Sequence, residues 1–309
     1  MKKTISFVIP IYNEEEVIPE LIKQLKGFID SYSKYNFEVI LVENGSSDSS
    51  FSLLKKYAQK DRRFKILQLV KNLGADGGIA AGLKYAKGEA VVTLMADLQE
   101  PFHLIKAFTK KWEEGYEIVN GVVRRRTAGF LNNLVARSYY KLINLLTGNM
   151  IPENVSDCKL MDKKVYQVIN QMEEQNKFLR GLTVWTGFKH TGIPFDRKKR
   201  FAGKPKATFV GNLKTALSGI LSYSYVPLHL VAIMGLIITT ISFVLVIFYL
   251  ARYFVYGRQT PGVSTIILSL FFLFGMLFFV LGIISEYIVR IYDEVKKRPN
   301  FIVRSKTNL

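Results

Sequence analysis

Four polar segments each follow a short apolar run, and their side chains could together bind a diphosphate and a divalent cation. They are YNEEE at 12–16, ENGSSD at 43–48, NLGADGG at 72–78 and ADLQE at 96–100. A carboxylate such as Asp97 can hold a cation whose coordination is completed by phosphates and water. A glycine-rich turn that opens a helix presents free N–H groups to an anion. Each segment alone is more often an ordinary turn or helix cap. The prediction of a diphosphate and cation site therefore depends on the presence of all four.

The apolar runs have the length and β-branched content of buried strands. Strands are expected at Ile5–Ile11, Phe37–Val42, Phe64–Val70, Ala90–Met95 and Glu117–Val123. Helical patterns fall between them, at Glu14–Tyr32, Ser49–Gln59, Gly78–Ala86 and Phe102–Trp112. This alternation predicts an α/β domain with a mostly parallel sheet covered on both faces. Ligands of such sheets bind beyond the carboxyl ends of the strands, where the four polar segments lie.

The composition excludes several classes of protein. The chain has 309 residues, of which 49% are hydrophobic, and a formal net charge of +18. That hydrophobicity excludes an intrinsically disordered chain. The single cysteine, Cys158, excludes a disulfide framework or a cysteine-rich zinc site, and three histidines leave little material for a histidine-based metal centre. No nucleic acid partner is expected, because the basic residues adjoin apolar segments without a base-stacking motif.

Two long apolar segments are expected to cross a membrane, at Val226–Tyr249 and Val263–Tyr287. Each holds the roughly 20 apolar residues that a bilayer core requires, and each is apolar on every face, which argues against buried core helices. The N-terminal apolar run Ile5–Tyr12 is too short for a secretory signal. Two spans put both termini on one side, and the flanking basic residues favour the cytoplasmic side. Those residues are Lys204, Lys206 and Lys214 before the spans, Arg290, Lys296, Lys297 and Arg298 after them, and only Arg252 and Arg258 between them.

The order of the motifs resembles that of inverting family-2 glycosyltransferases with the GT-A fold. Three later segments narrow the resemblance: VSDCKLMDKKV at 155–165, NKFLRGLTVWTGF at 176–188 and FDRKKRFAGKPK at 195–206. Together with the two spans, they make the whole chain similar to bacterial polyprenyl-phosphate glycosyltransferases of the dolichol-phosphate mannose synthase type. The resemblance implies inverting transfer of a hexose from a nucleotide-sugar, by default a UDP-hexose such as UDP-glucose. The implied acceptor is undecaprenyl or another polyprenyl phosphate, at the cytoplasmic face of the bacterial inner membrane, for cell-envelope glycan modification.

The same resemblance divides the chain into four regions. A cytoplasmic GT-A domain occupies 1–206, an interfacial amphipathic helix 207–225, a two-helix transmembrane hairpin 226–287 and a cytoplasmic basic tail 288–309. A lipid bilayer is therefore an expected partner. A separate flippase and a downstream transferase are also expected, because two spans do not build a translocation path. A homo-oligomer is compatible with the sequence.

Site residues follow from the resemblance, position by position. The positions matching donor contacts are Pro10, Tyr12, Glu14, Glu43, Asn44, Asp76 and Ala96. Asp97 and Gln99 match the ligands of a Mg²⁺ or Mn²⁺ ion. Two departures are present: Met95 replaces the first aspartate of the family's D-x-D motif, and Glu43-Asn44 stands where two aspartates are usual.

The acceptor side is matched by four further residues. Asp157 corresponds to the proposed catalytic base, and Arg200 is the second expected catalytic residue. Arg180 and Lys206 are expected to bind substrate phosphates. A lipid monophosphate is mostly ionised at neutral pH, so Asp157 can instead orient the acceptor or accept a residual proton. The segment 197–206 can equally be a basic patch that attracts anionic lipids.

Two alternatives remain open at this point. Met95 and the Glu43-Asn44 pair are compatible with a glycosyltransferase-like membrane protein that has lost catalysis and serves as a binding or scaffold subunit. A transferase acting on another membrane acceptor is the second alternative. The Q-x-x-R-W signature typical of processive synthases does not occur in the sequence.

Overall fold

The computed structural model describes residues 2–124, 154–175, 177–202, 226–257 and 262–309. The chain forms two compact units, one of Met1–Thr215 with Arg298–Leu309 and the other of Ala216–Lys297. The expected interfacial helix at 207–225 and the expected phosphate-binding Lys206 lie outside the described residues.

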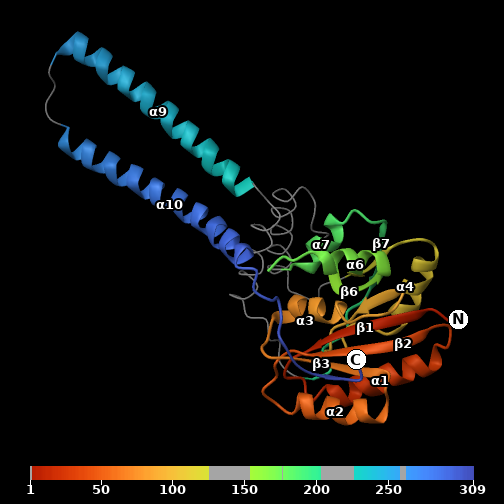
Figure 1. Cartoon of the computed structure of the whole chain (residues 1–309). Coiled ribbons are helices and arrows are strands. Elements are labelled where there is room, and N and C mark those ends of the chain that lie inside the picture. The colour runs from red at the N-terminus through yellow and green to blue at the C-terminus, as the bar shows by residue number, and fades with distance from the viewer. Residues whose placement is uncertain (1, 125–153, 176, 203–225, 258–261) are drawn as a thin grey trace. The chain divides into compact units, whose positions relative to one another are not determined.

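The first unit alternates strands and helices (Figure 1). In chain order these are β1 (Thr4–Ile11), α1 (Ile18–Ser31), β2 (Asn36–Glu43), α2 (Ser50–Lys60), β3 (Phe64–Leu69), α3 (Gly74–Leu83), β4 (Ala90–Thr93), α4 (His103–Glu113), β5 (Ile118–Val123), β6 (Val155–Asp162), α6 (Lys163–Gln171), α7 (Leu179–Trp185), β7 (His190–Phe195) and β8 (Val303–Thr307). The five strands and four helices expected from the sequence are present, with ends shifted by at most four residues.

The eight strands that the structure describes in this unit form one sheet, in the order β7-β5-β6-β4-β1-β2-β3-β8. β1 is parallel to β2 and β4, β2 to β3, and β5 to β7. β6 is antiparallel to both β4 and β5, and β8 is antiparallel to β3. The predicted α/β class with a mostly parallel sheet is therefore confirmed. Because β1 to β4 run the same way, their carboxyl ends share one edge, where the polar segments gather.

The strands before these segments are held by a dense apolar core. In β1 and β2, seven of the eight residues are buried, as expected for strands covered on both faces. Phe7 of β1 stacks on Phe37 of β2, with ring centroids 5.5 Å apart. A Cβ atom on Gly82 of α3 would lie 2.4 Å from Cγ1 of Val8, so only glycine lets α3 approach the sheet this closely. The core thus fixes the strand ends that carry the polar side chains.

The last residues of the chain extend the sheet, which the sequence analysis did not anticipate for the expected tail at 288–309. In the β3–β8 pair, Thr307 lies opposite Ile66. Asn308 Nδ2 donates to the carbonyl oxygens of Ala58 (2.8 Å) and Phe64 (3.0 Å). The end of the chain is consequently part of the same folded unit as β1–β7.

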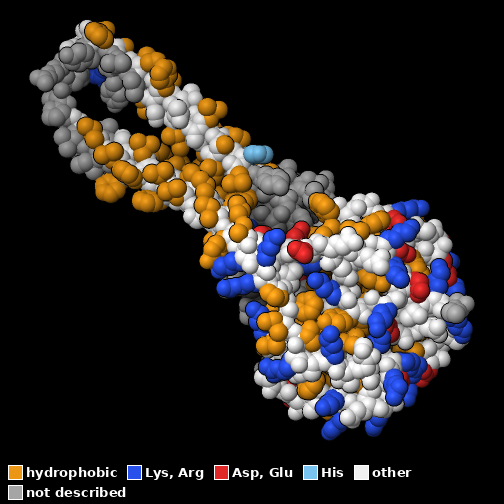
Figure 2. Space-filling view, viewed as in Figure 1, with side chains coloured by type: hydrophobic (Ala, Val, Ile, Leu, Met, Phe, Trp, Pro, Cys, Tyr) orange, Lys and Arg blue, Asp and Glu red, His pale blue; other side chains and the backbone are white. Residues whose placement is uncertain are grey.

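The second unit consists of α9 (Val226–Tyr256) and α10 (Val263–Val295). Each contains a segment apolar enough to cross a membrane, Leu228–Leu245 with mean hydropathy 2.3 and Ser269–Val295 with mean hydropathy 2.2. Figure 2 shows hydrophobic side chains along the surface of both helices. Such a surface is unfavourable in water and suits a bilayer. Both helices continue beyond the spans expected from the sequence.

Candidate active site

Asp97 follows β4 in a tight turn at the shared strand edge. Leu98 has φ = +58°, a left-handed conformation that is uncommon for residues other than glycine. The turn is closed by Gln99 N, which donates to Asp97 Oδ1 at 3.3 Å. It leaves Asp97 buried, with only 5% of its surface exposed. The ADLQE segment therefore positions the expected metal carboxylate inside the protein rather than on its surface.

Arg200 lies against this carboxylate. Its Nη2 is 3.1 Å from Asp97 Oδ2, and its Nη1 is 3.6 Å from Glu14 Oε1. The structure thus brings together Glu14, Asp97 and Arg200. The sequence analysis expected them to contact the donor, to bind the cation and to take part in catalysis, respectively. The guanidinium compensates two acidic groups that would otherwise repel each other in a poorly solvated site.

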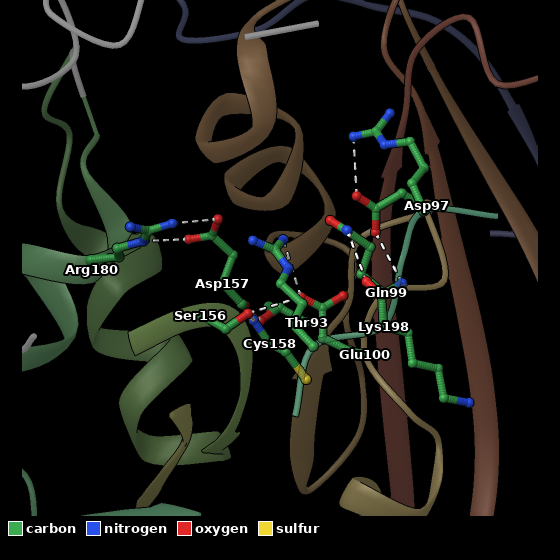
Figure 3. Close-up of polar contacts among 11 residues, drawn as sticks. Thr93, Asp97, Gln99, Glu100, Ser156, Asp157, Cys158, Arg180 and Lys198 are labelled. Carbon is green, nitrogen blue, oxygen red and sulfur yellow. Dashed lines mark hydrogen bonds and ion pairs between the residues drawn. The ribbon is translucent and has the colours of Figure 1, made fainter. Parts of the chain in front are cut away.

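The loop that carries Arg200 is fastened to the same turn. Lys198 N donates to the Gln99 carbonyl oxygen at 3.0 Å, and Gln99 Nε2 donates back to the Lys198 carbonyl oxygen at 3.1 Å. Phe201 N donates to the Asp97 carbonyl oxygen at 3.4 Å. Figure 3 shows Gln99 next to Asp97 at this turn, and the side chain of Lys198 extending away from them. The basic loop and the acidic turn therefore form one structural element.

The oxygen atoms at this turn suit a hard divalent cation. Asp97 offers a carboxylate and Gln99 an amide oxygen, and Mg²⁺ usually takes one or two carboxylates and completes its octahedron with phosphates and water. In the described part of the chain, no group of three or more His, Cys, Asp or Glu side chains could hold a metal. The donor set thus fits an ion that takes part of its coordination from a substrate, and it does not fit an all-protein cage.

Glu100 is a further acidic residue of this turn, and its importance was missed in the sequence analysis. Its side chain is almost fully buried, Oε1 accepts a hydrogen bond from Ser156 Oγ at 2.9 Å, and Arg197 Nη2 lies 3.6 Å away. Burial and the neighbouring Asp97 raise the pKa of Glu100 to about 7. Glu100 therefore links the turn that carries Asp97 to the start of β6, next to Asp157.

Asp157 of β6 is paired with Arg180 of α7 (Figure 3). Arg180 donates from Nε to Asp157 Oδ1 at 2.6 Å and from Nη2 to Oδ2 at 2.8 Å. Burial disfavours the charged form of Asp157, but the hydrogen bonds and charge of Arg180 outweigh it and lower the pKa of this carboxyl. A carboxylate that is already ionised and doubly hydrogen-bonded is a weak base, so orientation suits Asp157 better than proton abstraction.

Glu43 and Asn44 hold turns together. The Glu43 carboxylate accepts a hydrogen bond from Ser46 N. Asn44 donates from Nδ2 to the Gly74 carbonyl oxygen at 2.8 Å and accepts at Oδ1 from Leu73 N at 3.0 Å. Both side chains are buried. In this structure Glu43 closes the turn after β2 and Asn44 fixes the entry to α3, so polar atoms of both side chains are used within the protein.

The glycine-rich segment enters its helix earlier than expected. α3 begins at Gly74, so Gly78 lies inside it. A Cβ atom on Gly78 would be 2.9 Å from Pro10 Cβ and 3.3 Å from Asn44 Nδ2. Gly78 therefore serves close packing of α3 on the expected donor residues. Asp76, in the first turn of α3, accepts a hydrogen bond from the Leu179 backbone N–H.

The two remaining donor positions also lie at the strand edge. Tyr12 is partly exposed in the turn after β1, close to Glu14. Ala96 is buried beside Asp97, so its contribution to a ligand can come only from its backbone and its methyl group. All expected site residues that the structure describes therefore lie at or next to the carboxyl ends of the parallel strands.

Sequence comparison agrees with this geometry. The family described as glycosyl transferase family 2 matches residues 6–169. The chain is a family 2 glycosyltransferase. It is 38% identical to the uncharacterized glycosyltransferase YkcC of Bacillus subtilis, over 97% of this chain and 93% of that protein. It is 34% identical to the bactoprenol glucosyl transferase of Shigella phage SfII, over 97% of each chain. The family inferred from the motifs is confirmed.

The fold of this glycosyltransferase also occurs in a solved structure. The chain is similar in fold to glucosyl-3-phosphoglycerate synthase from Mycobacterium tuberculosis, with a TM-score of 0.50 and 18% sequence identity. That structure is a complex with Mn²⁺, UDP-glucose and phosphoglyceric acid. The match covers 72% of this chain and 79% of the synthase. At this level of identity the likeness concerns the fold alone, and it supports the GT-A architecture.

Lys159 lies beside the expected site residue Asp157, and the sequence analysis did not consider it. It is 3% exposed and lies on β6, two residues after Asp157. Side chains two apart on a strand point to the same face. The strand VSDCKLMD also carries a serine and two aspartates, so its sequence did not mark this lysine as buried.

Proposed function

We propose that this glycosyltransferase transfers a hexose from a UDP-sugar to undecaprenyl or another polyprenyl phosphate, with inversion at the anomeric carbon. The transfer requires a divalent cation, Mg²⁺ or Mn²⁺, and takes place at the cytoplasmic face of the bacterial inner membrane. The product is a lipid-linked sugar for cell-envelope glycan modification, which a flippase and a downstream transferase use in turn.

The observation that carries the proposal is the pair of carboxylate–guanidinium contacts at one sheet edge. Asp97 with Arg200 suits the diphosphate of a donor, and Asp157 with Arg180 suits an acceptor phosphate. Arginine offers a planar fork of donors that matches phosphate oxygens. A transfer from a nucleoside diphosphate to a lipid phosphate requires one phosphate-binding group for the donor and another for the acceptor. The phage relative is named for bactoprenol glucosyl transfer, which supports this assignment.

On the donor side, the chain provides ligands and a counter-charge. Asp97 and Gln99 would hold the cation, which when bound neutralises the charge of the departing nucleoside diphosphate. Arg200 stands beside Asp97 and can turn its guanidinium from the carboxylate to a phosphate oxygen. Pro10, Asn44 and Gly78 keep α3 in contact with the strand ends, which fixes the floor of the donor site.

On the acceptor side, Asp157 and Arg180 orient the nucleophile. The acceptor phosphate is mostly ionised at neutral pH, so it attacks without a strong base. Arg180, held by Asp157, draws the phosphate to the face of the sugar opposite the leaving group. The in-line displacement has oxocarbenium character, as in other glycosyl transfers, and it inverts the anomeric configuration.

The position of β8 supports the proposed topology. Because β8 pairs with β3, the end of the chain must lie on the same side of a membrane as the sheet. An even number of crossings between them satisfies this requirement, and α9 and α10 provide two apolar helices of sufficient length. Lys296, Lys297 and Arg298 follow α10, which favours the cytoplasmic side by the positive-inside rule.

The test is a donor panel assayed in membranes that contain the full chain. Labelled UDP- and GDP-sugars are supplied with undecaprenyl phosphate, with and without Mn²⁺, beside membranes carrying Asp97→Ala. The proposal expects a chloroform-soluble sugar-phosphate lipid from one UDP-hexose, dependent on the cation and absent with Asp97→Ala. Absence of product from every donor, together with absence of nucleotide binding, would support the non-catalytic alternative. Full activity of Asp97→Ala would remove the cation site from the mechanism.

A further inference from the structure

A buried lysine on β6 is not explained by the donor and acceptor contacts described above. Lys159 is 3% exposed, and its Nζ donates to Thr183 Oγ1 of α7 at 3.3 Å. Burying an ammonium group is costly unless opposite charges and hydrogen bonds compensate it. Its surroundings therefore have to supply that compensation.

Three charged side chains surround Lys159. Asp76 comes from α3, Asp157 from β6 and Arg180 from α7. Asp76, Asp157 and Lys159 line one cavity of about 10 Å³ together with Thr93 and apolar side chains. The two carboxylates and the two cations balance in formal charge, so each member is stabilised by the others. Removal of any one leaves an uncompensated charge in a poorly solvated space.

Hydrogen bonds from this cluster hold α7 against the rest of the unit. Asp76 accepts from the N–H of Leu179, the first residue of α7. Arg180, the second residue, is fixed by Asp157, and Thr183 is fixed by Lys159. α7 is thus attached to α3 and to β6 by separate polar contacts, and its short length of seven residues gives it little stability of its own.

We propose that Lys159 is a positioning residue that holds α7, and with it the Arg180–Asp157 pair, in the geometry required by the acceptor phosphate. The identity of the acceptor rests on the proposed function, whereas the attachment of α7 does not.

The charge state of the cluster gives the inference a pH signature. The groups that face Lys159 are Asp157, Asp76 and Arg180, with the thiol of Cys158 beside it. Burial lowers the pKa of Lys159 to about 8, and burial together with Asp157 raises the pKa of Asp76 to about 7. As the pH rises through 8, Lys159 loses its proton and the cluster keeps an uncompensated negative charge. Turnover of the native chain is therefore expected to fall on the alkaline side.

The experiment compares Lys159→Met with the native chain and with Lys164→Met, a control that removes an exposed lysine from the neighbouring helix α6. Full-length chains in nanodiscs are assayed with undecaprenyl phosphate and the active UDP-hexose between pH 6 and 9. UDP affinity in the presence of Mn²⁺ is measured by calorimetry. Hydrogen exchange of the α7 amides is followed by mass spectrometry without substrates.

Lys159→Met is expected to lower kcat by about ten- to a hundredfold, as misplacement of reacting groups does. UDP affinity should stay within about twofold, since the donor contacts are intact. The variant should lack the alkaline fall near pH 8, and its α7 amides should exchange faster. Lys164→Met should match the native chain in all respects.

The inference would be overturned by a kcat within about twofold of native, by an alkaline fall that persists in Lys159→Met, or by unchanged exchange in α7. If the native chain forms no lipid-linked sugar from any donor, the proposed function fails instead. The exchange measurement then decides alone whether Lys159 positions α7.

Discussion

Arg200 Nη2 lies 3.1 Å from Asp97 Oδ2, on the carboxylate that the proposed cation requires. Under the proposed function, a divalent ion would compete with this guanidinium for the same carboxylate. Binding of the ion would displace Arg200 from Asp97 and make its side chain available to a substrate phosphate. The contact would thus couple binding of the cation to the availability of a phosphate-binding residue.

This competition makes a specific prediction for Arg200→Gln. Removing the guanidinium should tighten Mn²⁺ binding in the absence of nucleotide by about tenfold, equivalent to about 1.4 kcal/mol. The same variant should turn over more slowly, because a phosphate contact is lost. Mn²⁺ affinity is measured by electron paramagnetic resonance of the free ion. Lys199→Gln removes a charge from an exposed position of the same loop and should change the affinity much less; unchanged or weaker binding by Arg200→Gln would contradict the competition.

The variant Asp157→Asn distinguishes an orienting role of Asp157 from a role as general base. The asparagine keeps the shape of the side chain but weakens its hold on Arg180, so kcat should fall by about ten- to a hundredfold while UDP affinity hardly changes. Steady-state rates over a pH series, with calorimetry for UDP, make the comparison. Because the pKa of Asp157 is lowered, its loss should not remove a titration near neutral pH. Native activity in Asp157→Asn would exclude an essential role of either kind.

Glu100 makes stability depend on pH. Its pKa is about 7 in the folded chain against an ordinary value of 4.5. The folded chain therefore binds a proton that the unfolded chain releases between these values, and stability falls as the pH rises from 4.5 to 7. Glu100→Gln lacks this penalty, so its melting temperature relative to native should be higher at pH 8 than at pH 5. Thermal unfolding of both chains at the two pH values measures it, and an equal difference at both would refute the assignment.

Asn308 tests the attachment of the chain end to the sheet. It has φ = +62° and donates to two carbonyl oxygens. Asn308→Gly removes the hydrogen bonds but tolerates the left-handed backbone, at a cost of about 1–2 kcal/mol. Asn308→Ala adds about 1 kcal/mol of backbone strain. Denaturant unfolding should rank the chains native, glycine, alanine in falling stability, and an alanine variant as stable as native would refute the attachment.

The strands and the polar edge could be predicted from the sequence because they depend on local patterns. Continuous apolar runs such as Ile5–Ile11 identify strands buried on both faces, and parallel order then places their carboxyl ends together. Glu14 and Asp97 lie in segments selected in this way, whereas Asp157, Arg180 and Arg200 were expected only from the family resemblance. The structure pairs Asp97 and Glu14 with Arg200, and Asp157 with Arg180.

Other features depend on contacts between segments far apart in the chain. β8 pairs with a strand more than 200 residues earlier, and its alternating charged residues give no strong strand signal. Glu43 and Asn44 stabilise turns through hydrogen bonds to Ser46 and Gly74. The sequence does not show which residues these side chains contact. The roles of Glu100 and Lys159 likewise depend on the burial of their side chains, which no sequence pattern around them indicated.

The most direct test of the account uses the purified full chain in nanodiscs with Mn²⁺ and a labelled UDP-hexose. Undecaprenyl phosphate is compared with undecaprenol as the acceptor, and the anomeric configuration of the product is determined by nuclear magnetic resonance. The account predicts a glycosyl-phosphate lipid with inverted configuration from the phosphate alone. Equal transfer to undecaprenol, or retention of the donor configuration, would contradict it.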